Sequence, residues 1–326
     1  MKIAVFDIGT NSIHMMVAQI HSDRTFKVLE REKDTTRLGD GSFEKHRLRK
    51  SAMKRAWNVI ERFHDMAKEF DVQKVIGVAT SAVRDARNGR AFVREILRRT
   101  GVRIRVISGE EEGRLIELAA RSNFRVKGKR TLVADIGGGS MELVLGDGKK
   151  HYYLKSFPLG VARLTDHFLR KDPPSQKQLR NLERHVEKIL RSAVEKIDEK
   201  RVSIVIGTAG TMINLASMVY ESETSKRLKL KHHYDLERWK LEKVHSEIVR
   251  MSLKNRLNFP GLDSKRADII VAGSTLVRVL MRMLRINRIL VSKCGIREGM
   301  VLDFIAKNRR ALSKRPSGRI LPRGRS

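Results

Sequence analysis

One short pattern occurs twice in the chain, and it constrains the fold more than any other feature of the sequence. An apolar run predicted to be a strand ends in an aspartate, a glycine-rich turn follows, and a second apolar run begins. The first copy is Asp7-Ile8-Gly9-Thr10-Asn11-Ser12, and the second is Asp135-Ile136-Gly137-Gly138-Gly139-Ser140. Because short strands alternate with amphipathic helices around both copies, the pattern indicates an α/β protein built from two halves of the same design.

The predicted elements follow the same order in each half. Strands are expected at 2–8, 13–21, 26–30, 75–79 and 102–107, and helices at 46–70, 90–99 and 110–122. Tight turns separate the first three strands, which predicts an antiparallel meander. The second half has expected strands at 131–136, 141–145, 151–157 and 202–206. The polar segment 125–129 contains a glycine and predicts the boundary between the halves.

The balance of charge predicts the kind of partner. The chain has 69 Lys and Arg against 37 Asp and Glu, a net charge of +32, which favours a polyanion: nucleic acid, an anionic membrane or a polyphosphate chain. Aromatic residues make up only 5% of the chain, which weakens the case for a protein that stacks single-stranded bases. A solvated basic surface without a partner is the alternative. Residues 304–326 contain eight bases and no acid, which predicts a disordered basic tail that captures polyanions.

Several features are missing from the sequence, and each argues against a class of protein. No apolar run approaches the roughly 18 residues of a membrane-spanning helix, so no membrane partner is expected. The single cysteine, Cys294, excludes an intrachain disulfide and suits a reducing cytoplasm. The sequence has no Walker A motif, no HExxH motif and no complete GxGxxG fingerprint. These absences count against a P-loop ATPase, a zinc protease and a Rossmann dehydrogenase.

The two glycine-rich turns are candidate phosphate sites. Each follows a strand and offers backbone N–H groups and hydroxyls, which together form an anion-binding concavity. Two such turns in matching positions predict a cleft with a phosphate clamp on each side. The candidate residues are Gly9, Thr10, Asn11 and Ser12 in the first turn and Gly137, Gly138, Gly139 and Ser140 in the second. Arg84 follows the strand at 75–79 and is a candidate for bidentate contact with a phosphate.

Acidic residues near these turns predict a cation site and a general base. Asp7, Asp135 and Glu142 supply the oxygen ligands that Mg²⁺ prefers, and Mn²⁺ is a candidate for the same position. Three acids, Glu110 to Glu112, open a predicted helix, where the helix dipole favours negative charge. Since three exceed what a helix start needs, one is expected to face the cleft as a general base.

Six motifs in this order and spacing resemble the exopolyphosphatase/guanosine pentaphosphate phosphohydrolase family: DIGTNSIH, ATSAVRDARN, ISGEEEGRLI, DIGGGSMELV, GTAGT and GIREGM. The resemblance covers about residues 1–306. It implies two duplicated actin-like, ribonuclease-H-like domains with an active-site cleft between them. The first would be 1–124, with a C-terminal helix at about 296–306 packing back on it, and the second 125–306. Residues 307–326 would form the tail, and the chain is too short for the HD-type domain of larger relatives.

The resemblance also implies a function. The expected activity is that of an exopolyphosphatase, a metal-dependent, processive hydrolysis of terminal phosphate from inorganic polyphosphate. By position in the motifs, Glu112 matches the catalytic glutamate, and Arg84 matches an arginine near the substrate. Gly207, Thr208 and Gly210 stand where the actin-like fold contacts adenosine, and are added to the phosphate-binding set. A cytoplasmic homodimer is implied.

Other functions stay open from the sequence. The nearest is a guanosine pentaphosphate 5′-phosphohydrolase, with guanosine penta- and tetraphosphate as ligands. A phosphotransferase from polyphosphate to ADP is the second. A non-catalytic module that binds polyanions or alarmones is the third.

Overall fold

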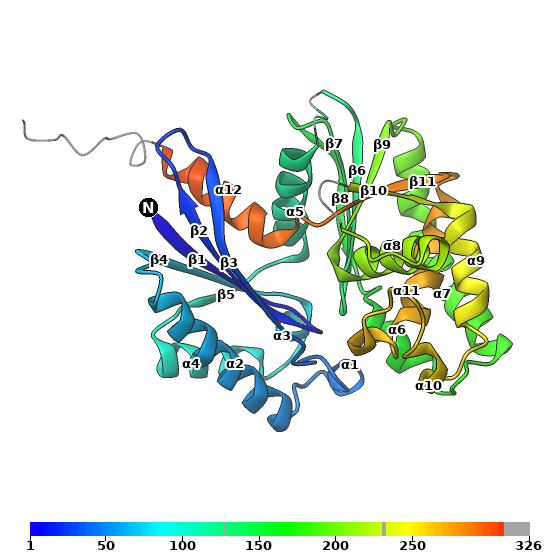
Figure 1. Ribbon diagram of the computed structural model, residues 1–326, viewed down its shortest axis with the longest axis horizontal. Coiled ribbons are helices and arrows are strands. Elements are labelled where there is room, and N and C mark those ends of the chain that lie inside the picture. The colour runs from blue at the N-terminus through cyan, green and yellow to red at the C-terminus, as the bar shows by residue number, and fades with distance from the viewer. Residues whose placement is uncertain (125, 127, 230–232, 310–326) are drawn as a thin grey trace, which may run out of the picture.

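The fold has two mixed sheets with helices packed on them (Figure 1). The computed structural model describes residues 1–124, 126, 128–229 and 233–309. Most of the predicted basic tail, 310–326, therefore lies outside the described residues. Within the described residues, no helix is both long and apolar enough to span a lipid bilayer.

The first sheet has the strand order β3-β2-β1-β4-β5. Its strands are β1 (Lys2–Ile8), β2 (Ile13–Ile20), β3 (Phe26–Asp34), β4 (Lys74–Ala79) and β5 (Ile104–Val106). The first three form the predicted antiparallel meander, because tight turns join them. Strand β4 is parallel to β1, and β5 is parallel to β4, since helical crossovers precede both.

The second sheet repeats this order and adds one strand. Its strands are β6 (Thr131–Ile136), β7 (Met141–Gly146), β8 (His151–Phe157), β9 (Ile204–Thr208), β10 (His233–Glu237) and β11 (Arg288–Ser292). Their order, β8-β7-β6-β9-β11-β10, matches that of the first sheet up to β11, with β10 as an antiparallel edge strand. The pairings are again antiparallel for β6, β7 and β8 and parallel for β6, β9 and β11. The fold is therefore the duplicated one expected from the sequence.

Helices fill the connections between the strands. Those of the first half are α1 (Ser42–Lys45), α2 (Lys50–Lys68), α3 (Ser81–Arg84), α4 (Gly89–Thr100) and α5 (Gly109–Asn123). Those that follow are α6 (Val161–Phe168), α7 (Gln176–Asp198), α8 (Ala209–Thr224), α9 (Arg238–Ile248), α10 (Leu253–Arg256), α11 (Ile270–Met283) and α12 (Ile296–Lys307). The helix predicted at 46–70 starts later, at Lys50, because His46 takes a left-handed φ of 47° that ends α1.

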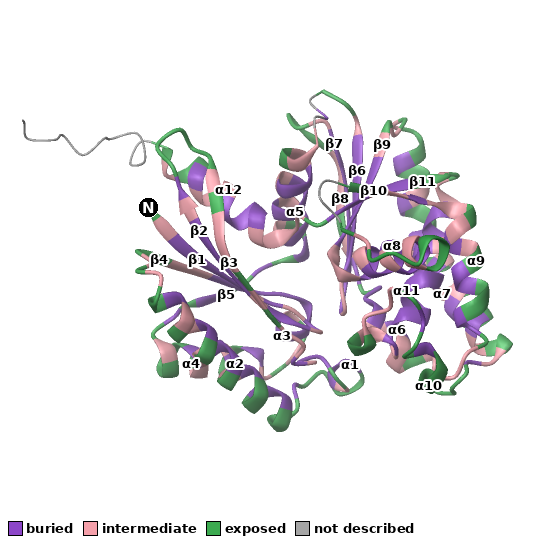
Figure 2. Ribbon diagram, viewed as in Figure 1, coloured by how far each residue is buried: buried purple, intermediate pink, exposed green. Residues whose placement is uncertain are grey.

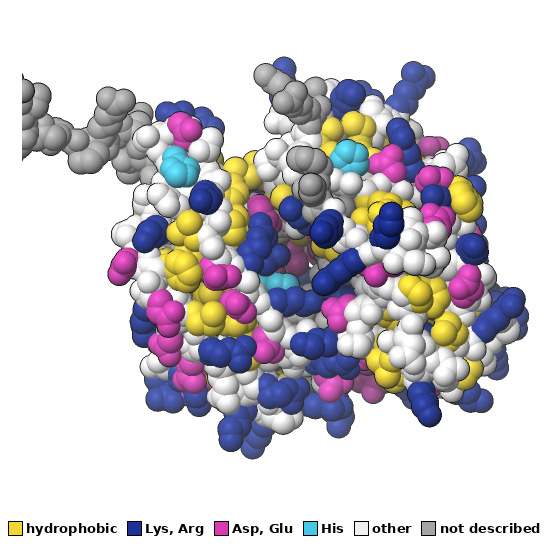
Figure 3. Space-filling model, viewed as in Figure 1, with side chains coloured by type: hydrophobic (Ala, Val, Ile, Leu, Met, Phe, Trp, Pro, Cys, Tyr) yellow, Lys and Arg dark blue, Asp and Glu magenta, His cyan; other side chains and the backbone are white. Residues whose placement is uncertain are grey.

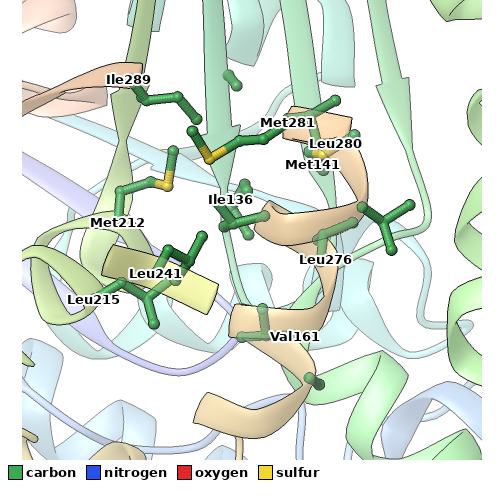
Figure 4. Close-up of a cluster of buried hydrophobic side chains, with 14 of the residues drawn as sticks. Ile136, Met141, Val161, Met212, Leu215, Leu241, Leu276, Leu280, Met281 and Ile289 are labelled. Atoms are coloured by element: carbon green, nitrogen blue, oxygen red, sulfur yellow. The ribbon is translucent and has the colours of Figure 1, made fainter. Parts of the chain in front are cut away.

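The largest core lies on one face of the second sheet, under α6, α7, α8, α9 and α11 (Figure 4). In that view Ile136, Met141 and Ile289 from the sheet lie near Met212 of α8 and Leu276 of α11. The first sheet has a core on each face. Helices α2 and α4 cover one face, and α12 packs on the other, where buried residues line the interior (Figure 2). The burial of these apolar side chains is the main stabilising contribution to each half.

Helices α5 and α12 lie between the two sheets. Ile116 and Ala120 of α5 pack on Val133 and Val144 of the second sheet. Val301 of α12 packs on the first sheet, and the two helices contact each other. The end of the described chain thus returns to the first sheet. The N-terminus of α5, which carries Glu112, is thereby held between the two halves. The boundary placed at residue 125 stays a prediction.

Candidate active site

A cleft of about 860 Å³ lies between the two halves, and both glycine-rich turns line it. Figure 3 shows the hollow with Lys and Arg side chains around it. Most of the residues predicted for the site lie on its wall: Asp7, Gly9, Thr10, Asn11, Ser12, Glu112, Asp135, Gly138, Gly139, Ser140 and Gly210. The other predicted residues do not line it: Gly137, Glu142, Arg84, Gly207 and Thr208.

The two turns have the same backbone geometry. The N–H of Gly9 donates to the carbonyl of Ser12 at 3.1 Å, and the N–H of Gly137 donates to that of Ser140 at 3.1 Å. In each copy, the aspartate at the end of the first strand pairs with a polar residue of the second. Asp7 lies opposite His14, and Asp135 lies opposite Glu142. The duplication therefore extends from the strand order to the individual turns.

The second turn packs directly against the first half. A Cβ on Gly139 would lie 2.5 Å from Oγ1 of Thr10 and 2.6 Å from Oγ of Ser81. Since a real Cβ does not approach other heavy atoms so closely, only glycine fits here. The run of glycines thus lets the two turns meet at one end of the cleft.

Helix α5 turns one acid of the Glu110–Glu112 run toward the cleft. The hydroxyl of Ser108 caps the helix and accepts the N–H of Glu111 at 3.1 Å. Glu110 is exposed, and the carboxylate of Glu111 is bonded to Arg105 at 2.8 Å. Glu112 is only 8% exposed and lines the cleft. Of the three acids, only Glu112 therefore lines the cleft.

Arg84 holds Glu112 in place from behind. Its Nη1 donates to Oε2 of Glu112 and to the carbonyl of Ile107, both at 3.1 Å. Arg84 does not line the main cleft; it lines a smaller hollow of about 320 Å³ on the other side of the turns. The structure thus shows Arg84 in contact with Glu112, and the contact with substrate expected from the sequence stays a prediction.

Burial raises the pKa of each carboxyl group at the base of the cleft. It raises the pKa of Asp7 to about 7, against the opposing charge of Arg297, and Asp135 adds to the effect. The pKa of Asp135 rises to about 6, although the Thr208 hydroxyl opposes the rise. That of Glu142 rises to about 8, from burial and from the charge of Asp135. Burial and Glu142 raise the pKa of Glu112 well above its usual value. A bound cation would oppose this effect and favour the ionised carboxylates.

The donor atoms fit a hard divalent cation. Oε1 of Glu142 accepts the Ser156 hydroxyl at 2.7 Å, but its buried Oε2 has no hydrogen-bond partner. All the donors offered by Asp7, Asp135 and Glu142 are oxygens, the type that Mg²⁺ takes. Among the described residues, no three acids, histidines or cysteines converge into a complete ligand set. Mg²⁺ in phosphoryl-transfer sites commonly uses only one or two carboxylates, and completes its shell with phosphate and water.

The remaining predicted residues support the site from within the fold. The buried hydroxyl of Thr208 donates to Oδ1 of Asp135 and so orients that carboxylate. Gly207 lies inside β9, where a Cβ would collide with Met212 and approach Ile289. It therefore serves the packing of the second core. Gly210 lies at the start of α8, against the guanidinium of Arg266.

The sequence reasoning missed the basic residues of the cleft. Six bases line it, namely Arg31, Lys33, Arg227, Arg266, Lys293 and Arg297. Apart from Asp7, Glu112 and Asp135, the acids that line it are Glu32, Glu221 and Asp263. His14 lies among the bases, and burial together with Arg297 and Lys33 holds its pKa well below its usual value. No sequence signal marked this set, because Arg31, Glu32 and Lys33 all line the cleft and the strand expected at 26–30 ended before them.

Ion pairs join the two halves at the side of the cleft. Arg37, which follows β3, donates to both carboxylate oxygens of Asp268 at 2.6 and 3.1 Å. Arg163 of α6 donates to the carbonyl of Gly139 at 2.9 Å and pairs with Asp85 of the first half. These contacts hold the two turns in their relative position.

The comparisons with known proteins agree with this geometry. The model of the Ppx/GppA phosphatase family matches residues 16–308. Exopolyphosphatase 1 of Mycobacterium tuberculosis is 28% identical over 303 residues, which are 93% of this chain and 88% of that protein. Exopolyphosphatase 1 of Mycobacterium leprae is also 28% identical, over 93% of this chain and 89% of its own length.

Solved structures are similar over the same length. A crystal structure of an exopolyphosphatase from Cytophaga hutchinsonii has a TM-score of 0.88 at 28% identity, covering 94% of this chain and 98% of that one. The Ppx/GppA family member of Aquifex aeolicus has a TM-score of 0.78 at 28% identity, with coverage of 94% and 98%. This chain and these structures thus share the same fold.

Proposed function

Because the chain belongs to the Ppx/GppA phosphatase family, we propose that it is an exopolyphosphatase, which hydrolyses the terminal phosphate of inorganic polyphosphate and releases orthophosphate. One observation carries the proposal. Glu112, a buried carboxylate held by Arg84, lines the same cleft as two copies of one glycine-rich turn. The curated relatives named exopolyphosphatase support the choice of substrate.

The cleft suits a long, highly charged substrate. Its six bases attract a polyanion, and their field is strongest in a confined site with walls of low dielectric constant. The turn hydroxyls of Thr10, Ser12 and Ser140 line the same wall and donate to phosphate oxygens. Unlike a nucleotide, a polyphosphate chain repeats its charge along its whole length. A cleft lined by six bases therefore suits a substrate with several successive phosphates.

Hydrolysis needs a base and a fixed water. Glu112 accepts a proton from a water that attacks the terminal phosphorus, and its raised pKa makes the ionised carboxylate a stronger base. The bond from Arg84 fixes the direction of the carboxylate, so the water is presented in line with the bond that breaks. The bridging oxygen then leaves with the shortened chain.

The carboxylates beyond Glu112 are proposed to hold Mg²⁺. Asp135, Asp7 and Glu142 would hold it together with phosphate oxygens and water, and Thr208 orients Asp135 for this task. When bound, the ion neutralises the charge that develops on the phosphate oxygens. Mn²⁺ offers the same chemistry.

The test is orthophosphate release by the purified chain, with polyphosphate and guanosine pentaphosphate compared at equal terminal-phosphate concentration. We expect Mg²⁺-dependent release that is faster from polyphosphate. Faster release from the nucleotide would favour the guanosine pentaphosphate phosphohydrolase. Appearance of ATP when ADP is added would favour a phosphotransferase. Tight polyphosphate binding without turnover would favour a binding module.

The oligomeric state and the cellular location are expected only from the family resemblance of the sequence. We expect a homodimer, which light scattering coupled to gel filtration measures directly. A cytoplasmic location is likewise an expectation, consistent with the single cysteine of the chain.

A further inference from the structure

The active-site end of the main cleft adjoins a second hollow. This hollow has a volume of about 320 Å³ and shares Ser81 and Ser140 with the main cleft. Its other lining residues include Arg84, Glu110, Ser156 and Arg163. Glu110, Asp85 and Pro158, which also line it, are exposed, so the hollow reaches the surface.

Arg84 and Glu112 together form the wall between the two spaces. Glu112 lines the main cleft and Arg84 lines the second hollow, and the two are joined by the 3.1 Å hydrogen bond. Ser81 and Ser140 face both spaces at the point where the phosphate turns meet. The reacting phosphate would therefore lie between the two spaces.

In-line hydrolysis would place the remaining chain in the main cleft and the new orthophosphate toward the second hollow. The attacking water and the departing chain lie on opposite sides of the phosphorus. A new bond forms between the water oxygen and phosphorus, the bond to the bridging oxygen breaks, and the water proton passes to Glu112. Since the remaining chain fills the main cleft, the new orthophosphate lies on its far side, toward the second hollow.

We propose that the second hollow is the exit for orthophosphate, and that water reaches the site by the same path. The inference rests on the exopolyphosphatase function proposed above. While the shortened chain stays bound, the main cleft is closed to the product. An exit on the opposite side lets orthophosphate leave before the chain does, which is what repeated cleavage of one chain requires.

The charges that line the second hollow suit an orthophosphate that passes through more than one that stays bound. Arg84 and Arg163 offer donors to a phosphate, and Ser81, Ser108 and Ser156 add hydroxyls. Two acids, Asp85 and Glu110, balance the two bases. Arg163 is already bonded to Asp85 and to Gly139. A neutral, polar lining solvates the anion without binding it tightly.

The test narrows this exit with a large side chain. Glu110→Trp and Pro158→Trp replace exposed residues of the second hollow that take no part in the proposed chemistry. Lys155→Trp is the matched control, because Lys155 is exposed on β8 but lines neither space. The turnover number is measured with long polyphosphate and with tripolyphosphate, and circular dichroism checks the fold of each variant.

We expect at least about a tenfold fall in turnover on the long chain when product release becomes limiting. Tripolyphosphate should be much less affected, because its short remnant dissociates and frees the main cleft for the product. Unchanged turnover on the long chain, or an equal loss on both substrates, would overturn the proposed exit. If the unmodified chain releases no phosphate from either substrate, the proposed function itself fails.

Discussion

Nη1 of Arg84 donates a hydrogen bond to Oε2 of Glu112 across 3.1 Å, and this bond joins the segments that follow two neighbouring strands. Strands β4 and β5 are parallel, so their carboxyl ends lie at the same edge of the first sheet. Arg84 lies at the end of the short helix after β4, and Glu112 lies in the first turn of the helix after β5. The topology thus brings together the proposed base, Glu112, and the residue proposed to orient it, Arg84, and each role can be tested separately.

Glu112→Gln keeps the size of the side chain and removes its ability to accept a proton. We expect orthophosphate release from polyphosphate to fall at least ~10²-fold, the usual cost of losing a general base. Glu69→Gln is the control, since Glu69 is exposed just after α2 and lines neither the cleft nor the second hollow. Near-normal release by Glu112→Gln would remove Glu112 from the catalytic role.

Arg84→Met separates two roles for the arginine. If Arg84 orients Glu112, kcat should fall by about 10- to 100-fold while KM changes little, because an interaction made in the transition state is lost. A large rise in KM with kcat preserved would instead mean that Arg84 binds substrate, as expected from the sequence. Arg87→Met, which changes an exposed arginine of the following loop, is the control. Initial rates over a range of polyphosphate concentrations give both constants.

The sequence predicted the parts of this site that depend on local pattern. The matched turns after Asp7 and Asp135 follow from alternation, glycine content and the tight connection to the next strand. These are properties of a few adjacent residues, and the structure gives them the same backbone geometry. The acidic start of α5 was equally local, and of its three acids only Glu112 is buried and lines the cleft.

The parts that depend on distant contacts could not be predicted. Arg31 and Lys33 line the cleft opposite Arg266, more than two hundred residues later. No periodicity in a single sequence links such positions. From the sequence, Gly207 was expected in a turn after the strand at 202–206. In the structure it lies within β9, where Met212 packs against it. Tertiary packing, and not local preference, decided these positions.

Removal of metal should abolish activity, and the affinity for Mg²⁺ should depend on Asp135. We expect EDTA-treated protein to release no orthophosphate until Mg²⁺ is restored. Asp135→Asn should need a substantially higher Mg²⁺ concentration for half-maximal activity, because a charged ligand is lost. Asp198→Asn, at the exposed end of α7, is the control. Full activity in EDTA, or an unchanged Mg²⁺ requirement in Asp135→Asn, would contradict the proposed cation site.

The stability of the second half should fall as the pH is lowered, because His245 is buried in its neutral form. Nδ1 of His245 lies 2.9 Å from Oγ of Ser274, and Nε2 faces Nη1 of Arg278 at 3.4 Å. Burial, and then the charge of Arg278, lower its pKa from 6.5 to about 4. The carboxylates of Glu183 and Glu242, both bonded to Arg278, are the other charges at this place.

The sign of the pH effect follows from the two states. Between pH 6.5 and about 4, the unfolded chain binds a proton at this position and the folded chain does not. The stability contributed by neutral His245 is therefore present above pH 6.5 and is lost as the pH falls, by roughly 2 kcal/mol at pH 5. Urea unfolding at pH 7 and pH 5 measures the loss. His245→Gln, which cannot titrate, should reduce the difference between the two pH values. An identical difference in the variant would rule out His245 as its source.

The C-terminal segment should matter more for long substrates than for short ones. Residues 310–326, which follow the described part of the chain, contain six bases and no acid. Deleting them should weaken binding of long polyphosphate more than that of tripolyphosphate, since only a long chain can occupy the cleft and contact the segment together. Because each phosphate contact releases counterions, the deletion should also reduce the dependence of the dissociation constant on salt concentration. The difference should be greatest at low salt, where charges are least screened.

A full-length variant with these six bases changed to glutamine separates the effect of charge from the effect of chain length. If it binds long polyphosphate as the intact chain does, the basic residues of the segment take no part in capture, and the charge that selects the substrate lies in the cleft alone.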